Sequence, residues 1–164
     1  MLIKFAVKNF RGFAERIEWD LSHPSNYSFN TYAVKDGVIK NGIIYGPNGS
    51  GKSNFALAIF DIEYHLSVKW KKADYLSNYV YIGNPNSPVE FEYVFKFGND
   101  ILEYRYSKNA SGMLIAESLV ANNKQVFKRE NDVFEIDDDQ FRIDATVKEN
   151  FKQNVNSVSV INFL

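Results

Sequence analysis

A glycine-rich octapeptide constrains this chain more than any other feature. Residues 46–53 are Gly-Pro-Asn-Gly-Ser-Gly-Lys-Ser, which matches the pattern of a glycine, four residues, and then Gly-Lys-Ser or Gly-Lys-Thr. A short run that ends Ile-Ile-Tyr precedes it at 41–45, and a helical pattern follows it from 51 to about 70. The sequence therefore predicts a strand, a tight loop and a helix in succession, which is the context that a phosphate-binding loop requires.

Each residue type in this loop has a physical role. Glycines let the backbone turn so that successive N–H groups point at phosphate oxygens, and the positive end of the following helix faces the anion. Lys52 can reach the β- and γ-phosphates, and the hydroxyl of Ser53 can ligate Mg²⁺. The residues expected to form this nucleotide site are Gly46, Asn48, Gly49, Ser50, Gly51, Lys52, Ser53 and Asn54.

The octapeptide, together with Asn-Phe-Arg-Gly-Phe at 9–13 after an opening strand, resembles ABC-class ATPases of the SMC, RecF and OLD branch. Most closely it is similar to the bacterial "AAA family ATPase" or "ATP-binding protein" group of abortive-infection and phage-defence systems. The resemblance rests on specific motifs over 1–70 and only on pattern over 89–135. It implies that Arg11 lies near the nucleotide phosphates, while the sequence alone equally fits a surface arginine in a hairpin turn.

The resemblance also implies a fold and an activity. The fold would be α/β with α+β character: the N-terminal lobe of a P-loop ATPase, with a strand–P-loop–helix core and an antiparallel β meander. The ligands would be ATP and Mg²⁺. In the full-length protein the heads would form a homodimer that hydrolyses ATP, with DNA, RNA or an associated nuclease as further partners. A non-catalytic interaction module regulated by nucleotide is the alternative.

Hydrolysis in such ATPases needs a second strand, four apolar residues followed by Asp-Glu. The run 133–138 has carboxylates, but Glu135 interrupts its apolar residues, which is typical of a half-exposed antiparallel strand. The run 113–117 is apolar and ends in Glu117 without an Asp before it. We therefore expect the catalytic strand in a further part of a longer protein. The other candidates lack a context that selects them: Ser111-Gly112 for the signature, His65 for the switch, Gln140 and Gln153 for the γ-phosphate, and the acidic run 137–139 for a metal.

Two other nucleotide-binding classes fit less well. A switch GTPase requires Asn-Lys-x-Asp, and the nearest match, Asn-Lys-Gln-Val at 123–126, lacks the aspartate. A small-molecule kinase needs clustered arginines in a lid, whereas Arg105, Arg129 and Arg142 are scattered.

The rest of the chain is predicted as a single partial domain, 1–164. Alternating residues over 2–10 and 16–21 predict a β hairpin before the loop and helix, and 71–88 is expected to be a linker. Five strand-like runs separated by turn residues predict an antiparallel meander at 89–97, 101–107, 113–120, 125–129 and 133–136. The tail 137–164 ends on an apolar run, 158–164, which we expect to pack against a further part of the protein.

Composition sets the remaining limits. The chain has no cysteine, so disulfides and thiolate metal sites are excluded. Apolar residues make up 45% and aromatic residues 16%, which is ample for a core. Residues 1–72 carry ten Lys/Arg against six Asp/Glu, and residues 73–164 carry nine against fourteen, so no strongly basic surface is indicated. The N-terminus lacks the apolar block of a signal peptide and no run is long enough to span a membrane, so we expect a cytoplasmic protein without a membrane partner.

Overall fold

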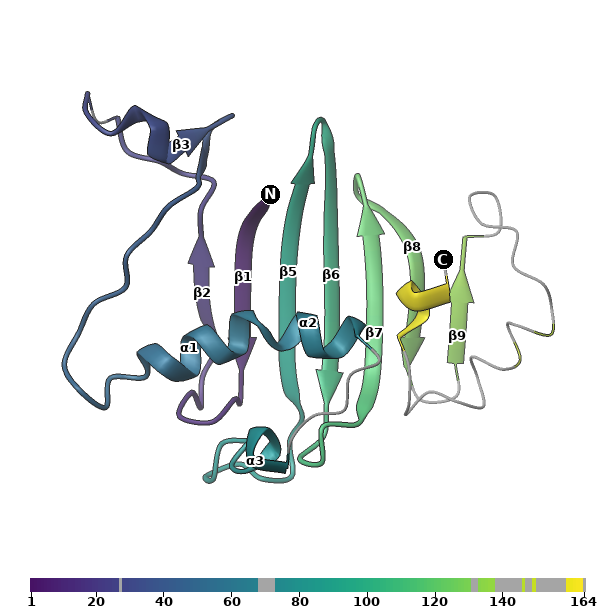
Figure 1. Ribbon diagram of the computed structural model, residues 1–164. Coiled ribbons are helices and arrows are strands. Elements are labelled where there is room, and N and C mark those ends of the chain that lie inside the picture. Colours follow the sequence, from purple (N-terminus) through teal and green to yellow (C-terminus); the bar gives the residue numbers. More distant parts are fainter. Residues whose placement is uncertain are drawn as a thin grey trace.

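A seven-stranded antiparallel sheet dominates the computed structural model, which describes residues 1–26, 28–67, 73–130, 133–137 and 159–163, with 146 and 149 singly. The strand order is β2-β1-β5-β6-β7-β8-β9 (Figure 1). A separate two-stranded hairpin, β3–β4, lies beyond β2 in the view of Figure 1. The bounds are β1 Leu2–Lys8, β2 Ile17–Asp20, β3 Val34–Lys35, β4 Val38–Ile39, β5 Val89–Phe97, β6 Asp100–Lys108, β7 Leu114–Ala121, β8 Lys124–Glu130 and β9 Val133–Ile136.

The predicted meander is confirmed. Each strand from β5 to β9 pairs antiparallel with the next one along the chain, and the bounds of β5 and β9 agree with the prediction. Turn chemistry explains the short connections. Asn122 and Asn123 join β7 to β8 with φ of 49° and 65°, the left-handed pair that a type I′ hairpin turn needs.

The first hairpin joins this meander through a long-range pairing. β1 pairs with β2, as predicted, and its other edge pairs antiparallel with β5, where Val7 lies opposite Phe91. The chain between β2 and β5 must therefore pass over β1 on one face of the sheet. The short helices α1 (Lys52–Ile59), α2 (Asp61–Leu66) and α3 (Ala73–Leu76) belong to this crossing segment, and α1 and α2 run across the strands (Figure 1).

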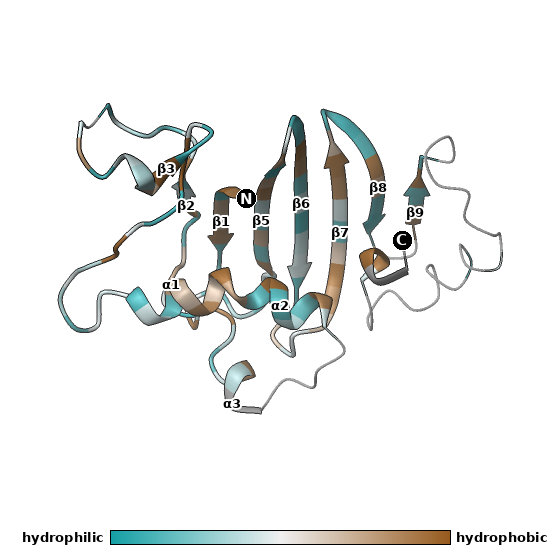
Figure 2. Cartoon of the chain, turned by 45° about the horizontal axis from the view of Figure 1, so that its top comes forward, coloured by the Kyte–Doolittle hydropathy of each residue, from teal (hydrophilic) through white to brown (hydrophobic). Residues whose placement is uncertain are grey.

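The core lies between these helices and the sheet, and it is rich in aromatic residues. Phe5, Phe91 and Tyr93 are almost fully buried, and Phe55 of α1 lies edge-on to Phe5 at 5.7 Å between ring centroids. The strands are banded brown and teal in Figure 2, as expected where helices cover one face only. α1 contributes partly buried side chains to this core. The apolar packing that buries one face of the sheet therefore also holds α1 in place.

The predicted strand–P-loop–helix core is wrong. The run 41–45 forms no strand: it lies in a long loop between β4 and α1, off the end of the sheet beyond β2 (Figure 1). Ile43 and Tyr45 are each 91% exposed. A strand needs a neighbour for its backbone N–H and C=O groups; β1 is already paired on both edges, and among the described residues nothing extends the sheet past the outer edge of β2. The fold is therefore mainly antiparallel β with short helices rather than an α/β core.

The long helix predicted from 51 to about 70 is also shorter than expected. It is divided at Phe60 into α1 and α2, and residues 68–70 lie outside the described residues. Ala58 is the buried residue of α1, and Phe60, which directly follows the helix, is 58% exposed. One side of this helix packs on the sheet and the other is open.

Two further segments lie against the core. The expected linker 71–88 contributes α3 and the buried residues Tyr79 and Val80. The described part of the C-terminal run includes Ser159 and Val160, which are buried, and the 3₁₀ turn Val160–Phe163. Ser159 and Val160 contact β7 of this chain's own sheet through hydrogen bonds to Glu117, whereas Val158 and Leu164 of the expected apolar run lie outside the described residues.

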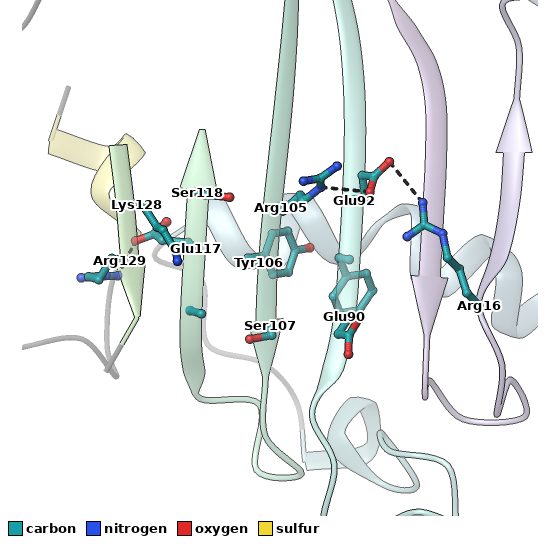
Figure 3. A pocket seen from close by; sticks show the side chains of 12 residues that line it. Arg16, Glu90, Glu92, Arg105, Tyr106, Ser107, Glu117, Ser118, Lys128 and Arg129 are labelled. Carbon is teal, nitrogen blue, oxygen red and sulfur yellow. Dashed lines mark hydrogen bonds and ion pairs between the residues drawn. The ribbon is translucent and has the colours of Figure 1, made fainter. Parts of the chain in front are cut away.

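The second face of the sheet is open and charged. A shallow groove of about 360 Å³ crosses it between Arg16 and Lys128 (Figure 3). At its centre Glu92, whose side chain is 9% exposed, accepts a hydrogen bond from Arg105 at 3.0 Å and pairs with Arg16 at 3.2 Å and Lys4 at 3.6 Å. The charges of this face largely neutralise each other, so the groove does not favour an ionic ligand of one sign.

The Glu92 cluster predicts a pH-dependent contribution to stability. Burial favours the neutral carboxyl, but the charge of Arg16 and the hydrogen bond from Arg105 outweigh it and lower the pKa of Glu92 below its ordinary 4.5. Glu92→Gln should lower the free energy of unfolding by about 1–3 kcal/mol at pH 7. Because a lowered pKa stabilises the fold above the unfolded pKa, this difference should disappear as pH falls through the folded value.

Chemical denaturation of both proteins between pH 7 and pH 3 measures this effect. Glu90→Gln is the matched control, because Glu90 is half exposed and pairs with Lys8 at 3.7 Å, a contact worth about 0–1 kcal/mol. A Glu92→Gln protein as stable as the wild type at pH 7 would contradict the prediction.

Candidate phosphate-binding loop

The octapeptide forms a compact turn directly before α1. Gly49 and Gly51 have φ of 82° and 92°, in the left-handed region that glycine adopts without strain. Gly51 is the N-cap of α1, and Lys52 is its first residue. The backbone N–H of Ser50 donates to the carbonyl of Pro47 at 3.3 Å, which closes the loop. The local geometry therefore places a glycine-rich turn at a helix N-terminus, as the sequence predicted.

The side chain of Lys52 folds back over this loop. Its ammonium donates to the carbonyl oxygens of Gly46 at 2.7 Å and Pro47 at 2.8 Å. These contacts hold the charge at the mouth of the loop, where residues 46–50 are exposed. Ser53 is also exposed, so its hydroxyl is accessible to an ion bound beside a phosphate.

The β1–β2 hairpin packs against the start of α1. A Cβ atom on Gly12 would lie 3.3 Å from Nδ2 of Asn54, and one on Gly51 would lie 2.9 Å from the ring of Phe13. The structure therefore brings the 9–13 motif and the octapeptide together, although they lie far apart in sequence. Gly51 is needed here twice, for its backbone conformation and for the space that Phe13 occupies.

Arg11 lies in this hairpin, but its guanidinium is turned toward α3. It donates to the carbonyl of Tyr75 at 2.7 Å, and its central carbon lies 5.6 Å from the Phe10 ring centroid and 5.7 Å from that of Tyr75. Its Nε is buried and has no hydrogen-bond partner among the described residues. In this conformation Arg11 holds α3 to the hairpin.

The carboxylates considered for catalysis lie far from the loop. Glu117 in β7 forms a buried ion pair with Arg129 and accepts a hydrogen bond from Ser159 at 2.7 Å. Glu135 lies in β9, at the opposite end of the sheet from the loop (Figure 1), and the alternating exposure of β9 agrees with the predicted antiparallel strand. His65 contacts Tyr104, with 2.7 Å between Nε2 and the hydroxyl.

The remaining sequence candidates lie either in the turn between β6 and β7 or outside the described residues. Ser111 and Gly112 form the turn between β6 and β7, where Asn109 accepts hydrogen bonds from Ser111. Gln140, Gln153 and residues 138–139 of the acidic run lie outside the described residues. Within the described ranges, no group of three or more His, Asp or Glu side chains could hold a metal ion, so Ser53 stays the candidate Mg²⁺ ligand from the chain.

A buried ionic cluster that the sequence did not predict lies behind α1. Asp61 is the first residue of α2, is fully buried, and forms an ion pair with Lys108 at the end of β6. A signal was present in the sequence. Asp61 interrupts an apolar helical run, and Lys108 has the same strand parity as Tyr104 and Tyr106, so it had to lie on the helix-covered face.

Comparisons with known proteins add no family. No known protein family matches the chain, and no curated protein matches it in sequence. Among the helices of the described segments, none is long and apolar enough to cross a membrane.

Gly51 offers a test of the loop geometry. Alanine at this position must adopt a left-handed conformation, which costs about 1–2 kcal/mol, and its methyl group must displace Phe13. Gly49→Ala is the matched control, because it carries the same backbone cost with no atom within 4 Å of the new Cβ. We expect Gly51→Ala to lower the melting temperature, measured by circular dichroism, clearly more than Gly49→Ala does. Equal melting temperatures for the two variants would contradict the packing of Phe13 on Gly51.

Proposed function

We propose that this chain binds the phosphates of ATP, with Mg²⁺, through the loop 46–53. The observation that carries the proposal is the octapeptide itself, with left-handed glycines at 49 and 51 and Lys52 at the first position of α1. The first turn of α1 contains no acidic residue to repel an anion. Backbone N–H groups of the loop, the N-terminus of α1 and a lysine thus lie next to each other, and each favours an anionic ligand.

The roles within the site follow from chemistry. The loop amides would contact phosphate oxygens, Lys52 would move from the carbonyls of Gly46 and Pro47 to the β- and γ-phosphates, and Ser53 would ligate Mg²⁺. Phosphoryl transfer also needs a positioned water and further charge neutralisation. Glu117 on β7 and Glu135 on β9 lie away from the loop, so we propose nucleotide binding for this chain and hydrolysis only in a longer protein whose heads dimerise.

A non-catalytic module regulated by nucleotide is the second candidate. It is favoured by the same observation, that Glu117 and Glu135 lie away from the loop. A chain that binds ATP without either carboxylate beside the phosphates would respond to the nucleotide without hydrolysing it. A phosphate-release assay on the chain separates the two. Turnover above background that Lys52→Ala abolishes would contradict the binding module.

Lys52→Ala tests the binding proposal directly. It removes the side-chain charge that would contact the phosphates, and an exchange of this kind costs about 1.5–3 kcal/mol, roughly 10- to 100-fold in affinity. The Lys52 side chain bonds only to carbonyls of its own loop in the described contacts, so the fold should survive. Isothermal titration calorimetry with Mg²⁺-ATP measures the change.

The matched control is Lys40→Ala, which removes an exposed lysine outside the octapeptide and changes the net charge equally. It should bind Mg²⁺-ATP as the wild type does. Equal affinities of wild type and Lys52→Ala would refute the site. Ser53→Ala should in addition reduce the gain in ATP affinity that Mg²⁺ provides.

A further inference from the structure

Asp61 carries one of the two most heavily bonded carboxylates among the described residues, and it lies two residues beyond the end of α1. Its side chain is fully buried. One oxygen accepts hydrogen bonds from the hydroxyls of Tyr75 at 2.6 Å and Tyr79 at 2.9 Å. The other accepts from Tyr106 at 2.9 Å and from the ammonium of Lys108. A single carboxylate thus joins α2 to α3, to the segment before β5, and to β6.

These donors satisfy both carboxylate oxygens at a fully buried position. A buried carboxylate is costly unless it is paired and hydrogen-bonded, and removing one partner of such a pair typically costs several kcal/mol. Lys108 is itself 1% exposed. Burial, followed by the negative charge of Asp61, raises the pKa of Tyr79 and of Tyr106, so both hydroxyls stay protonated donors. The geometry around Asp61 is therefore fixed from several directions.

This fixed point is continuous with α1. The N–H of Phe60 donates to the carbonyl of Ala56, and the N–H of Glu63 donates to the carbonyl of Phe60, so the hydrogen-bonded chain passes from α1 into α2. The hydroxyl of Tyr93 on β5 also donates to the carbonyls of Ala58 at 2.8 Å and Ile59 at 3.2 Å. The C-terminal end of α1 is thereby held to the sheet by directional bonds.

The opposite end of α1 carries the phosphate loop. The helix has eight residues, about 12 Å in length, and behaves as a short rigid rod. The octapeptide is exposed and has no strand to hold it. The position of the loop amides is therefore set by Phe13 at the near end and by the bonded cluster at the far end of α1.

We infer that Asp61 is a positioning residue for the phosphate loop: it fixes the far end of α1 and thereby aims the loop amides and Lys52 at the nucleotide. This inference rests on the proposed function. Asp61 contacts neither phosphate nor metal, and its effect is carried through α1.

A second buried carboxylate provides an internal control. Glu117 is 2% exposed and accepts from Tyr104 at 2.7 Å, from Ser159 and from the N–H of Val160. It forms its ion pair with Arg129 on β8. The Glu117 cluster therefore holds the C-terminal 3₁₀ turn to the sheet, and its link to the helices is the hydroxyl of Tyr104, which contacts His65 of α2 rather than α1. Loss of either charge should destabilise the fold, but loss of Asp61 alone should disturb the loop.

The experiment compares Mg²⁺-ATP affinity in Asp61→Asn, Glu117→Gln, Lys52→Ala and the wild type by calorimetry, at a temperature well below every melting transition. Asp61→Asn should weaken ATP binding about fivefold or more, at the lower end of couplings between distant sites. Glu117→Gln should lower the melting temperature comparably and leave the affinity within twofold of the wild type. Hydrogen exchange should show faster exchange of α1 amides in Asp61→Asn alone.

Tyr93→Phe keeps the inference testable if Asp61→Asn does not fold. It removes only the hydroxyl that bonds to the end of α1, and it should weaken ATP binding in the same direction by a smaller factor. If Lys52→Ala leaves ATP affinity unchanged, the proposed function fails. If Lys52→Ala weakens binding while Asp61→Asn and Tyr93→Phe bind as the wild type does, the positioning role alone is overturned. Equal losses of affinity in Asp61→Asn and Glu117→Gln would likewise overturn it, because general stability would then explain both.

Discussion

The antiparallel pairing of β1 with β5 determines where every other element lies. It joins residues 2–8 to residues 89–97. Closing a loop of this length costs conformational entropy, and the backbone hydrogen bonds and apolar burial that form with it must compensate for that cost. With β2 on the far edge of β1, the chain can reach β5 only by passing over β1. The helices of this crossing segment supply the apolar layer that covers the sheet, and the octapeptide lies where the crossing begins (Figure 1).

Two buried carboxylates then select one arrangement of that layer. Apolar side chains favour burial but specify direction weakly, whereas a buried carboxylate requires donors in defined places. The donors that Asp61 requires fix the positions of the helices, and the donors that Glu117 requires fix the position of the C-terminal 3₁₀ turn. His65 lies between the clusters: its ring stacks on Tyr106 at 4.0 Å between centroids and contacts the hydroxyl of Tyr104. Contacts on both sides of α2 thus fix how this helix packs on the covered face of the sheet.

The meander and the first hairpin could be predicted because their signals are local. Alternating residues and turn pairs such as Asn122-Asn123 fix each strand and its neighbour without reference to the rest of the chain. The run 41–45 could not be assigned in this way, because an apolar run becomes a strand only if it pairs with another strand, and 41–45 passes the edge strand β2 without pairing to it. For the octapeptide, the sequence predicted the turn and the start of the helix. It did not predict that Phe13 packs on Gly51 or that Asp61 holds the other end of α1, since both contacts depend on the tertiary crossing.

The placement of Lys52 shows how an exposed loop and an anchored helix act together. Its ammonium has three donors, and two of them contact the neutral carbonyls of Gly46 and Pro47. A phosphate offers charged oxygens instead, and hydrogen bonds between two charged groups are stronger than those to a neutral acceptor. Replacing the two carbonyl acceptors of Lys52 by phosphate oxygens is therefore favourable. It requires the loop to rearrange while the buried end of α1 stays fixed. The open space around Gly49 leaves room for the loop to adjust, and the buried end of α1 supplies the fixed base. Room to adjust in the exposed loop and directional bonds at the buried end of α1 are thus complementary requirements of the proposed anion site.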